Sequence, residues 1–206
     1  MLLIYSYVLY YVMVAFGITF GYHRSFAHKR YRPNKIVKSL MLYVGLLCGG
    51  QSVLRWSAVH RMHHKYVDTK KDPHSPIHQP WWKIVFSTWV IDTNPMVMCK
   101  DLIKDPIIMH FHENGWKYLF LTYFFSYLIH WKLLVSLLLV FVFSYIGFGV
   151  LNYFGHNENG AVNSRWINLF APFEGNHEDH HDYDNQSVTG IGLHRSYDVN
   201  HRQLYE

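Results

Sequence analysis

The sequence is poor in cysteine and in charge. Its 206 residues include only two cysteines, Cys48 and Cys99, and 16% of the residues are charged, against about 25% in an ordinary soluble domain. Two cysteines give neither a disulfide framework nor a cysteine-ligated metal cluster. Disorder is excluded as well, because half of the residues are hydrophobic. The basic residues outnumber the acidic ones by 19 to 14, which in so apolar a chain favours contact with anionic lipid over nucleic acid.

Long uncharged runs predict an all-α integral membrane protein. Residues 2–22 carry no charge and, at about 1.5 Å per helical residue, are long enough to cross a hydrocarbon core of about 30 Å. The run has neither the basic start nor the small-residue cleavage site of a signal peptide. Two later apolar runs are separated by a short polar break and predict a helical hairpin that crosses and returns. The three predicted spans are residues 2–22, 116–130 and 133–153.

Charge sets the predicted topology. The segment that follows the first span is basic, from Arg24 to Lys35, and the positive-inside rule places it in the cytoplasm. The apolar run 36–54 is expected to lie at the membrane interface, because a crossing there would put the histidine clusters on opposite sides. The polar tail, 157–206, then lies in the cytoplasm. The sequence therefore predicts one domain over 1–206, with interfacial helices under a cytoplasmic histidine-rich cap.

The 16 histidines are the most informative feature of the sequence. Two H-x-x-H-H motifs each place three imidazoles on one helical face, because residues i, i+3 and i+4 are neighbours there. Asn152 and His156 share a face in the same way. His23 and His28 are five residues apart, about 140° around an ideal helix, so we expect a helix end between them. The clustered histidines are His23, His28, His60, His63, His64, His156, His177, His180 and His181. The other seven have no such spacing and are expected to be ordinary core or surface residues: His74, His78, His110, His112, His130, His194 and His201.

Nine clustered histidines predict two metal ions. A closed structural zinc site takes four ligands, so nine imidazoles suit two ions with positions left open for chemistry. Imidazole ligates iron, zinc, copper and nickel, and the ligand count does not choose among them.

The motifs resemble the membrane-bound fatty acyl desaturase family. The matching stretches are His23-Arg-Ser-Phe-Ala-His28, His60-Arg-Met-His63-His64, Asn152-Tyr-Phe-Gly-His156 and Glu174-Gly-Asn-His177-Glu-Asp-His180-His181. The Asn-x-x-x-His motif is similar to that of the stearoyl-CoA (delta-9) branch. The chain resembles a short form of this branch, because family members usually carry one more membrane helix before the first histidine pair. The resemblance implies that the nine histidines hold two irons and that Asn152 holds a metal through water.

The same resemblance implies the chemistry and the partners. The expected reaction inserts a cis double bond into a long acyl chain, with O2 as co-substrate and an acyl-CoA or acyl-lipid as substrate. Electrons are expected from a separate protein of the cytochrome b5 or ferredoxin type, because the sequence shows no fused haem motif. Gln51, Trp56 and Phe148 are expected to line the substrate tunnel. Four acids are expected to orient ligating imidazoles through their second nitrogen: Asp68, Asp72, Glu174 and Asp182. The spacer acids Glu178 and Asp179 are expected to face solvent.

Two other functions remain open at the level of sequence. A related diiron fatty acid or sterol hydroxylase shares histidine boxes and membrane topology. An inactive membrane relic of the same fold would bind little iron. A metal carrier is disfavoured, because it needs polar residues inside its spans and residues 2–22 have almost none.

Overall fold

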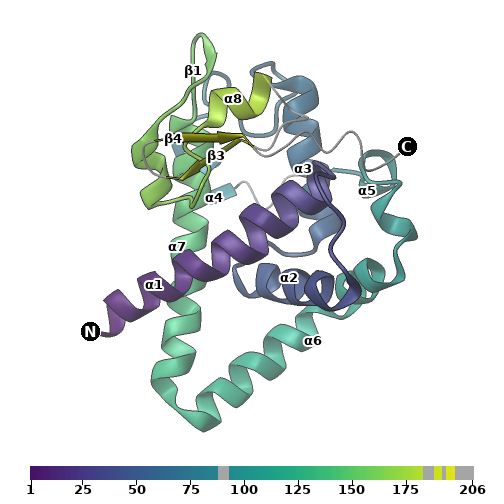
Figure 1. Cartoon of the computed structure of the whole chain (residues 1–206), viewed down its shortest axis with the longest axis vertical. Coiled ribbons are helices and arrows are strands. Elements are labelled where there is room, and N and C mark those ends of the chain that lie inside the picture. Colours follow the sequence, from purple (N-terminus) through teal and green to yellow (C-terminus); the bar gives the residue numbers. More distant parts are fainter. Residues whose placement is uncertain (88–92, 183–187, 192–193, 198–206) are drawn as a thin grey trace.

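The computed structural model describes residues 1–87, 93–182, 188–191 and 194–197, and most of these residues are helical (Figure 1). The helices in chain order are α1 (Leu2–Val14), η1 (Ala15–Ala27), α2 (Lys35–Leu47), α3 (Val53–Tyr66), α4 (Trp81–Ser87), α5 (Pro95–Met98), η3 (Leu102–Lys104), α6 (Pro106–Ile129), α7 (Trp131–Phe154), η4 (Arg165–Leu169) and α8 (His177–Asp182). The strands are β1 (His156–Asn157), β2 (Gly160–Ala161), β3 (Val188–Ile191) and β4 (His194–Tyr197). They pair as two small antiparallel sheets, β1–β2 and β3–β4, which the all-α expectation did not include.

Two helical stretches of the described chain are long and apolar enough to cross a membrane. The first is Leu2–Ala27, which comprises α1 and η1, and the second is α7. The expected spans 2–22 and 133–153 lie within them. The expected span 116–130 lies mostly in the second half of α6, and the first half of α6 carries polar residues such as Glu113. α6 is not among the helices that are long and apolar enough to cross a membrane. A third crossing therefore stays a prediction.

The apolar run 36–54 is not one helix. The Asn34 side chain accepts a hydrogen bond from Val37 N (3.0 Å) and begins α2, and the chain then turns at Gly49, where φ is +75°. α2 has 13 residues, about 20 Å of helix at the usual rise. That length is short of a hydrocarbon core of about 30 Å, which is consistent with an interfacial position.

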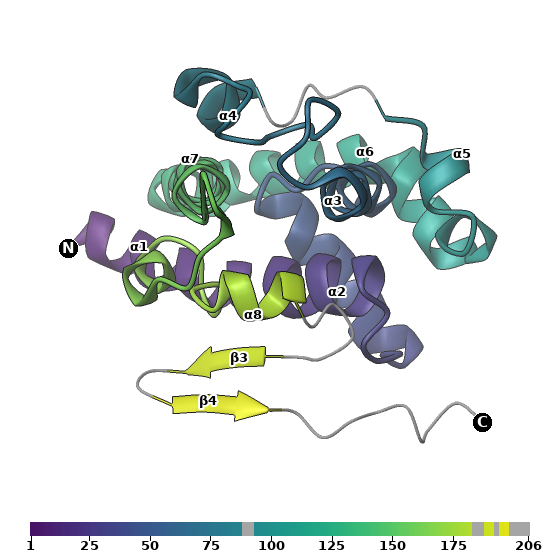
Figure 2. The ribbon, with the colours of Figure 1, turned by 90° about the horizontal axis from the view of Figure 1, so that it is seen from above.

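The histidine-bearing elements gather at one end of the molecule. Figure 1 shows α3, α8 and β1 in the upper half and the α6–α7 hairpin below, and Figure 2 shows α7 end-on beside α1. α1 packs along α7, and η1 packs against both α2 and α3. Arg61 fixes α3 to its neighbours: its guanidinium donates to the carbonyls of Phe26, Ala27 and Met98 at 2.8–2.9 Å. It also binds both carboxylate oxygens of Asp101 (2.7 and 3.0 Å).

Gly17 and Gly45 face each other where η1 crosses α2. A Cβ on Gly17 would lie 2.7 Å from the backbone nitrogen of Gly45, and a Cβ on Gly45 would overlap the ring of Tyr22. Tyr22 is 1% exposed and donates to the carbonyls of Leu42 and Gln51. Its ring therefore has no room to move aside.

We expect Gly45→Ala to lower the free energy of unfolding by about 1–3 kcal/mol, the usual cost of overpacking a closed contact. The measurement is the thermal unfolding midpoint of the detergent-solubilised protein. Leu40→Ala on the same helix is the control, because Leu40 is 49% exposed. Equal midpoints in the two variants would contradict the close crossing.

Candidate metal centre

Nine histidine side chains meet in one place, and they come from η1 and the residue after it, from α3, from β1 and from α8. They form two groups of four whose ligand nitrogens lie within 4.8 Å of one another. The first group is His23, His28, His60 and His180, and the second is His63, His156, His177 and His181. His64 lies between the groups: its Nε2 is 3.1 Å from Nε2 of His180, and its ring stacks on His181 with centroids 4.3 Å apart. The clustered histidines of the sequence are thus brought together as two adjacent sets.

The first pair converges by a route that the sequence did not predict. η1 is a π-helix, in which backbone hydrogen bonds join residues i and i+5. The backbone N–H of His28 donates to the carbonyl of His23 at 3.0 Å. A five-residue turn places the two side chains one above the other, and their ring centroids are 4.9 Å apart. The helix ends between His23 and His28 as expected, at Ala27, but the two rings meet because the helix up to that point is a π-helix.

Carboxylates hold the outer nitrogens of three histidines. Glu174 Oε1 accepts from Nδ1 of His23 at 2.9 Å. Both oxygens of Asp72 lie 2.9–3.0 Å from Nδ1 of His63. Asp68 Oδ2 is 3.0 Å from Nδ1 of His156. A proton on each Nδ1 leaves the Nε2 lone pair directed inward, which is the arrangement that orients metal-ligating imidazoles.

The inward nitrogens have the spacing of ligands around an ion. Four Nε2–Nε2 distances describe the two groups: His28–His60 2.7 Å, His23–His180 3.0 Å, His156–His177 3.0 Å and His63–His181 3.2 Å. Metal–imidazole bonds of about 2.1 Å place adjacent octahedral ligands about 3 Å apart. The donor set is all nitrogen, which suits a first-row transition metal. The residues present therefore fit a pair of such ions.

Burial keeps five of these histidines neutral. Desolvation, followed by the neighbouring histidines, lowers the pKa of His60, His63, His177 and His180 well below the usual range. Burial also lowers the pKa of His156, with Asp68 opposing the shift. Metal ions bind the neutral imidazole, so no proton has to be displaced from these nitrogens at neutral pH.

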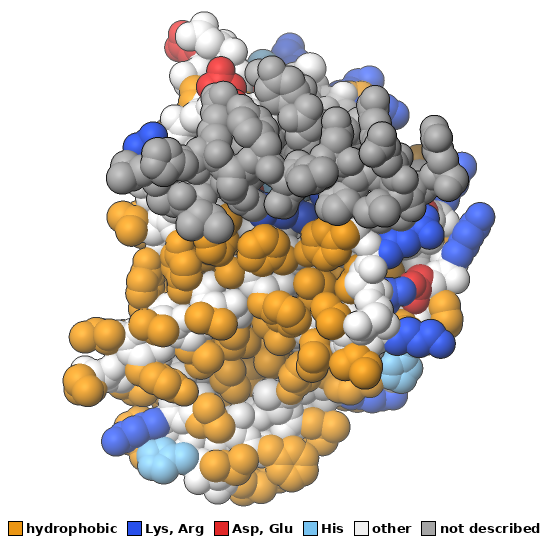
Figure 3. All heavy atoms as spheres, viewed as in Figure 1, with side chains coloured by type: hydrophobic (Ala, Val, Ile, Leu, Met, Phe, Trp, Pro, Cys, Tyr) orange, Lys and Arg blue, Asp and Glu red, His pale blue; other side chains and the backbone are white. Residues whose placement is uncertain are grey.

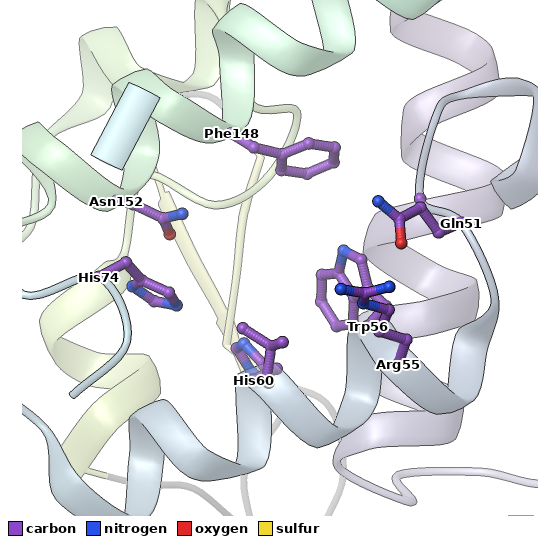
Figure 4. A pocket seen from close by; sticks show the side chains of 9 residues that line it. Gln51, Arg55, Trp56, His60, His74, Phe148 and Asn152 are labelled. Carbon is purple, nitrogen blue, oxygen red and sulfur yellow. The ribbon is translucent and has the colours of Figure 1, made fainter. Parts of the chain in front are cut away.

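The three expected tunnel residues line one cavity beside the histidines. Gln51, Trp56 and Phe148 share it with Asn152, and its empty volume is about 470 Å³. Figure 4 shows Gln51 and Trp56 facing Asn152 across the opening, with Phe148 at one end and His60 at the other. The Trp56 ring stacks on His60 with centroids 5.0 Å apart. The cavity therefore ends on the first histidine group.

Two residues line the cavity that were not expected there. His74 and Arg55 also line the cavity. His74 is 4% exposed and its ring lies 4.2 Å from that of His63, although its spacing in the sequence gave no signal beyond its place two residues after Asp72.

Among the acids around His177–His181, Asp179 differs from the expectation, and the side chain of Asp182 is not described. Glu178 is exposed as expected, but Asp179 is 7% exposed. The reason is that α8 packs against β2, and Asn163 beyond β2 accepts from the backbone N–H of Asp179 (3.3 Å). The side chain of Asp182, expected to orient an imidazole, lies outside the described residues.

Comparisons with known proteins identify the family of the chain. The family model for fatty acid desaturases matches residues 1–190. An acyl-CoA 5-desaturase of Anemone leveillei is 28% identical over 90% of this chain and 63% of its own length. An sn-1 stearoyl-lipid 9-desaturase of Synechocystis is 29% identical, also over 90% of this chain and 63% of its own length. A delta-9 desaturase-like protein of Arabidopsis thaliana is 28% identical over 88% of this chain and 66% of its own length. The chain thus spans somewhat under two thirds of the first relatives it matches, and its match to the family model over nearly its whole length shows that it belongs to the fatty acid desaturase family.

Proposed function

We propose that this protein is a fatty acyl desaturase with two iron ions held by the nine histidines. The single observation that carries the proposal is the pair of four-histidine groups with inward Nε2 atoms, in a chain of the desaturase family. The apolar cavity that ends on His60 supports an acyl substrate. The printed names of the relatives support acyl-CoA or acyl-lipid forms of that substrate.

The proposed reaction removes two hydrogens from adjacent methylenes. One O2, two electrons and two protons take up those two hydrogens, leaving a cis double bond and two waters. When bound, the iron pair supplies the oxidising power for this step. The protein binds the chain, excludes water and fixes which carbons lie next to the centre. An unactivated methylene offers no polar handle, so the walls formed by Trp56 and Phe148 must set the position of the double bond.

A second cleft supports delivery of electrons by a separate acidic protein of the cytochrome b5 or ferredoxin type. It has an empty volume of about 960 Å³ and reaches His28 and His64. Its lining carries four cationic side chains and one carboxylate: Lys29, Arg61, Lys65, Lys100 and Asp101. Complementary charge steers such encounters and fixes their orientation.

The surface supports a multi-pass membrane protein with the histidines on the cytoplasmic side. Figure 3 shows hydrophobic side chains over the lower part of the molecule and Lys and Arg side chains gathered along one edge. Large exposed apolar residues lie on α1, α6 and α7: Leu3, Ile4, Val8, Val12, Phe120, Phe124, Phe125, Leu128 and Leu138. Contiguous apolar surface of this kind is rare on soluble monomers and suits lipid contact.

Cysteine labelling tests whether α2 stays on one side. We expect Arg32→Cys and Lys70→Cys, both at exposed positions, to react with a membrane-impermeant maleimide from the cytoplasmic side only. His130→Cys, exposed in the α6–α7 turn, should react from the other side only. The native Cys48 and Cys99 are buried and give the background signal. Labelling of Arg32→Cys and Lys70→Cys from opposite sides would contradict a common face for the histidines.

Phe148 is expected to limit the substrate cavity. It is 8% exposed and stands at the end of the cavity opposite His60. Phe148→Thr should enlarge the cavity and change the selectivity between acyl chains that differ by one methylene about tenfold, as is usual for apolar pockets. Gas chromatography of the products measures the ratio. Val142→Thr on the same helix, 47% exposed, should leave it unchanged, and an unchanged ratio in both variants would remove Phe148 from the tunnel.

Lipid analysis of an expressing host tests the function itself. In a host whose own desaturase is inactivated, the native chain should restore monounsaturated acyl chains, and the purified protein should contain iron. A His63→Ala, His177→Ala variant, expressed to the same level, should restore none. Hydroxylated acyl chains or sterols in place of alkenes would identify the hydroxylase, and iron-free protein without new products would identify the relic.

A further inference from the structure

A third cleft lies between the segment that follows η1 and the chain that leads into α6. Its empty volume is about 1070 Å³, which is the scale of a site for a small organic molecule. It shares no lining residue with the cavity that ends on His60. A molecule held in the third cleft therefore lies outside the cavity proposed for the acyl chain.

The lining of the third cleft is basic. Four cationic side chains and two carboxylates line it: Lys29, Arg32, Lys38, Lys104, Asp101 and Asp105. Figure 3 shows Lys and Arg side chains gathered along the edge on which α5 lies in Figure 1. Four positive charges against two negative ones leave an excess of two, which favours an anionic ligand.

Asp101 is already bound by cations of the protein. Arg61 contacts both of its oxygens, at 2.7 and 3.0 Å, and Lys29 Nζ lies 3.2 Å from Oδ2. Burial raises the pKa of Asp101, but the hydrogen bonds and charge of Arg61 outweigh this effect and lower the pKa to about 2. This carboxylate is therefore committed to Arg61, which does not line the third cleft.

Asp105 is engaged in the same way, by Lys38 and by the first turn of α6. Its Oδ2 forms an ion pair with Lys38, and its Oδ1 accepts from the backbone N–H groups of Ile107 (2.9 Å) and Ile108 (3.3 Å). Lys104 is exposed and forms no ion pair with any residue that the structure describes. The acids of the cleft thus leave its positive charge only partly balanced.

The wall of the third cleft that follows η1 is held in place by the protein. The backbone N–H of Arg30 donates to the carbonyl of Arg24 at 2.9 Å. The Ser25 hydroxyl donates to the carbonyl of Tyr31 at 3.2 Å. Lys29 adopts the left-handed conformation that this turn requires, with φ at +57°. The cleft is therefore formed before a ligand arrives, which lowers the entropic cost of binding.

α2 relates the third cleft to the membrane. Lys38 lines the cleft, and Ile36 and Leu40, which are 73% and 49% exposed, lie two residues to either side of it. Two residues are about 200° around an α-helix, so these apolar side chains point away from the cleft. A helix with one basic and one apolar face lies in the membrane interface. On the proposed membrane position, the cleft opens at the level of the lipid phosphates.

We propose that the third cleft binds the phosphate headgroup of an anionic membrane lipid, with Arg32 and Lys104 as the side chains that contact the phosphate. The site is separate from the cavity for the acyl chain. It rests on the membrane position in the proposed function and not on the iron centre. The acidic electron donor is the alternative occupant, because Lys29 and Asp101 also line the second cleft. The apolar face of α2 favours the lipid.

Titration of dihexanoyl phosphatidylglycerol into the purified protein in a nonionic detergent tests the site, with a titration into detergent alone subtracted. We expect saturable binding of about one lipid per chain, and about tenfold weaker binding of dihexanoyl phosphatidylcholine, whose phosphate is balanced by its own cation. Lys104→Gln and Arg32→Gln should each raise the dissociation constant of phosphatidylglycerol about tenfold, the effect of one lost charge-assisted hydrogen bond. Lys104→Arg should keep most of the affinity.

Lys35→Gln is the matched control for these variants. Lys35 is an exposed cation at the start of α2 and does not line the third cleft, so its dissociation constant should equal that of the native protein. A diffuse attraction between basic side chains and anionic lipid predicts equal losses in Lys35→Gln and Lys104→Gln, and that result would overturn the site. The thermal unfolding midpoint, which should be the same in all these variants, separates loss of binding from loss of folding.

Two further probes distinguish the possible occupants. Glycerol phosphate carries the phosphate without acyl chains and should bind about tenfold more weakly than the lipid, since it buries no apolar surface. Equal binding would assign the cleft to a free phosphate compound and overturn the lipid. A soluble cytochrome b5 domain tests the electron donor. If Lys104→Gln weakens binding of this domain but leaves lipid binding unchanged, the cleft belongs to the donor and the proposal fails.

Failure of this site and failure of the proposed function are distinguishable. Native protein that binds the lipid but neither binds iron nor forms alkenes would support the lipid site and overturn the desaturase. Native protein that contains iron and forms alkenes but binds no phosphatidylglycerol would overturn the lipid site alone.

Discussion

His156→Ala is expected to remove iron from the second histidine group and to abolish desaturation while the helices stay folded. His156 Nε2 lies 3.0 Å from Nε2 of His177, and its Nδ1 is held by Asp68. The alanine variant leaves three nitrogens in that group and removes the partner of Asp68 Oδ2. Membrane insertion should survive, because it depends on hydrophobicity and on backbone hydrogen bonds within the spans. Iron per chain, measured by elemental analysis, should fall from two towards one.

Two histidines outside the centre, His130 and His110, differ in their value as controls for His156→Ala. His130 is a poor control, because its Nδ1 accepts from the backbone N–H of Lys132 (3.1 Å) and caps α7, and losing such a cap costs about 1 kcal/mol. His110 is exposed on α6 and its ring hydrogen-bonds the hydroxyl of Tyr118, so His110→Ala should keep both iron and activity. Asn152→Ala should keep more iron than His156→Ala and lower turnover. Full activity in His156→Ala would remove this residue from the centre.

Asp72→Asn is expected to weaken iron binding about 10–100-fold, the usual effect of losing the partner of a ligating histidine. Asp72 is 1% exposed and accepts from Nδ1 of His63 and from two backbone N–H groups. An asparagine has only one oxygen to accept from these donors. Its NH2 group would replace the second carboxylate oxygen and would face an N–H donor there. Burial already raises the pKa of Asp72 to about 6. The folded protein therefore bears a free-energy cost to keep this carboxylate charged beside His63.

Iron retention against a chelator measures the effect of Asp72→Asn. The chelator concentration at half-loss should fall about 10–100-fold, with the unfolding midpoint of the iron-free protein recorded beside it. Glu178→Gln is the matched control, because Glu178 is an exposed acid on the histidine-bearing α8. Identical retention in Asp72→Asn and Glu178→Gln would show that the carboxylate does not support His63.

Local spacing explains why the two H-x-x-H-H motifs could be read correctly. Three imidazoles at i, i+3 and i+4 share a face of any α-helix, whatever surrounds it, and α3 and α8 are such helices. The same rule failed for His23 and His28. Their convergence depends on a π-helix, and the α-helical period gives the wrong angle for a five-residue gap.

The contacts of the acids could not be predicted from the local sequence. Asp68, Asp72 and Glu174 contact His156, His63 and His23 across 88, 9 and 151 residues of sequence. Their residue type made them candidates, but the local sequence did not pair each acid with its histidine, and it wrongly placed Asp179 at the solvent.

The sequence by itself determined the apolar helical stretches, the nine-histidine set and the family, because each depends on composition or on spacing within one element. The tertiary structure alone decided which histidines form each group, which carboxylate holds each imidazole, and that His74 joins Asn152 at the cavity. These choices depend on how η1, α3, α7 and α8 pack against one another. Contacts between distant segments are set by shape and burial, and no periodicity within a segment encodes them.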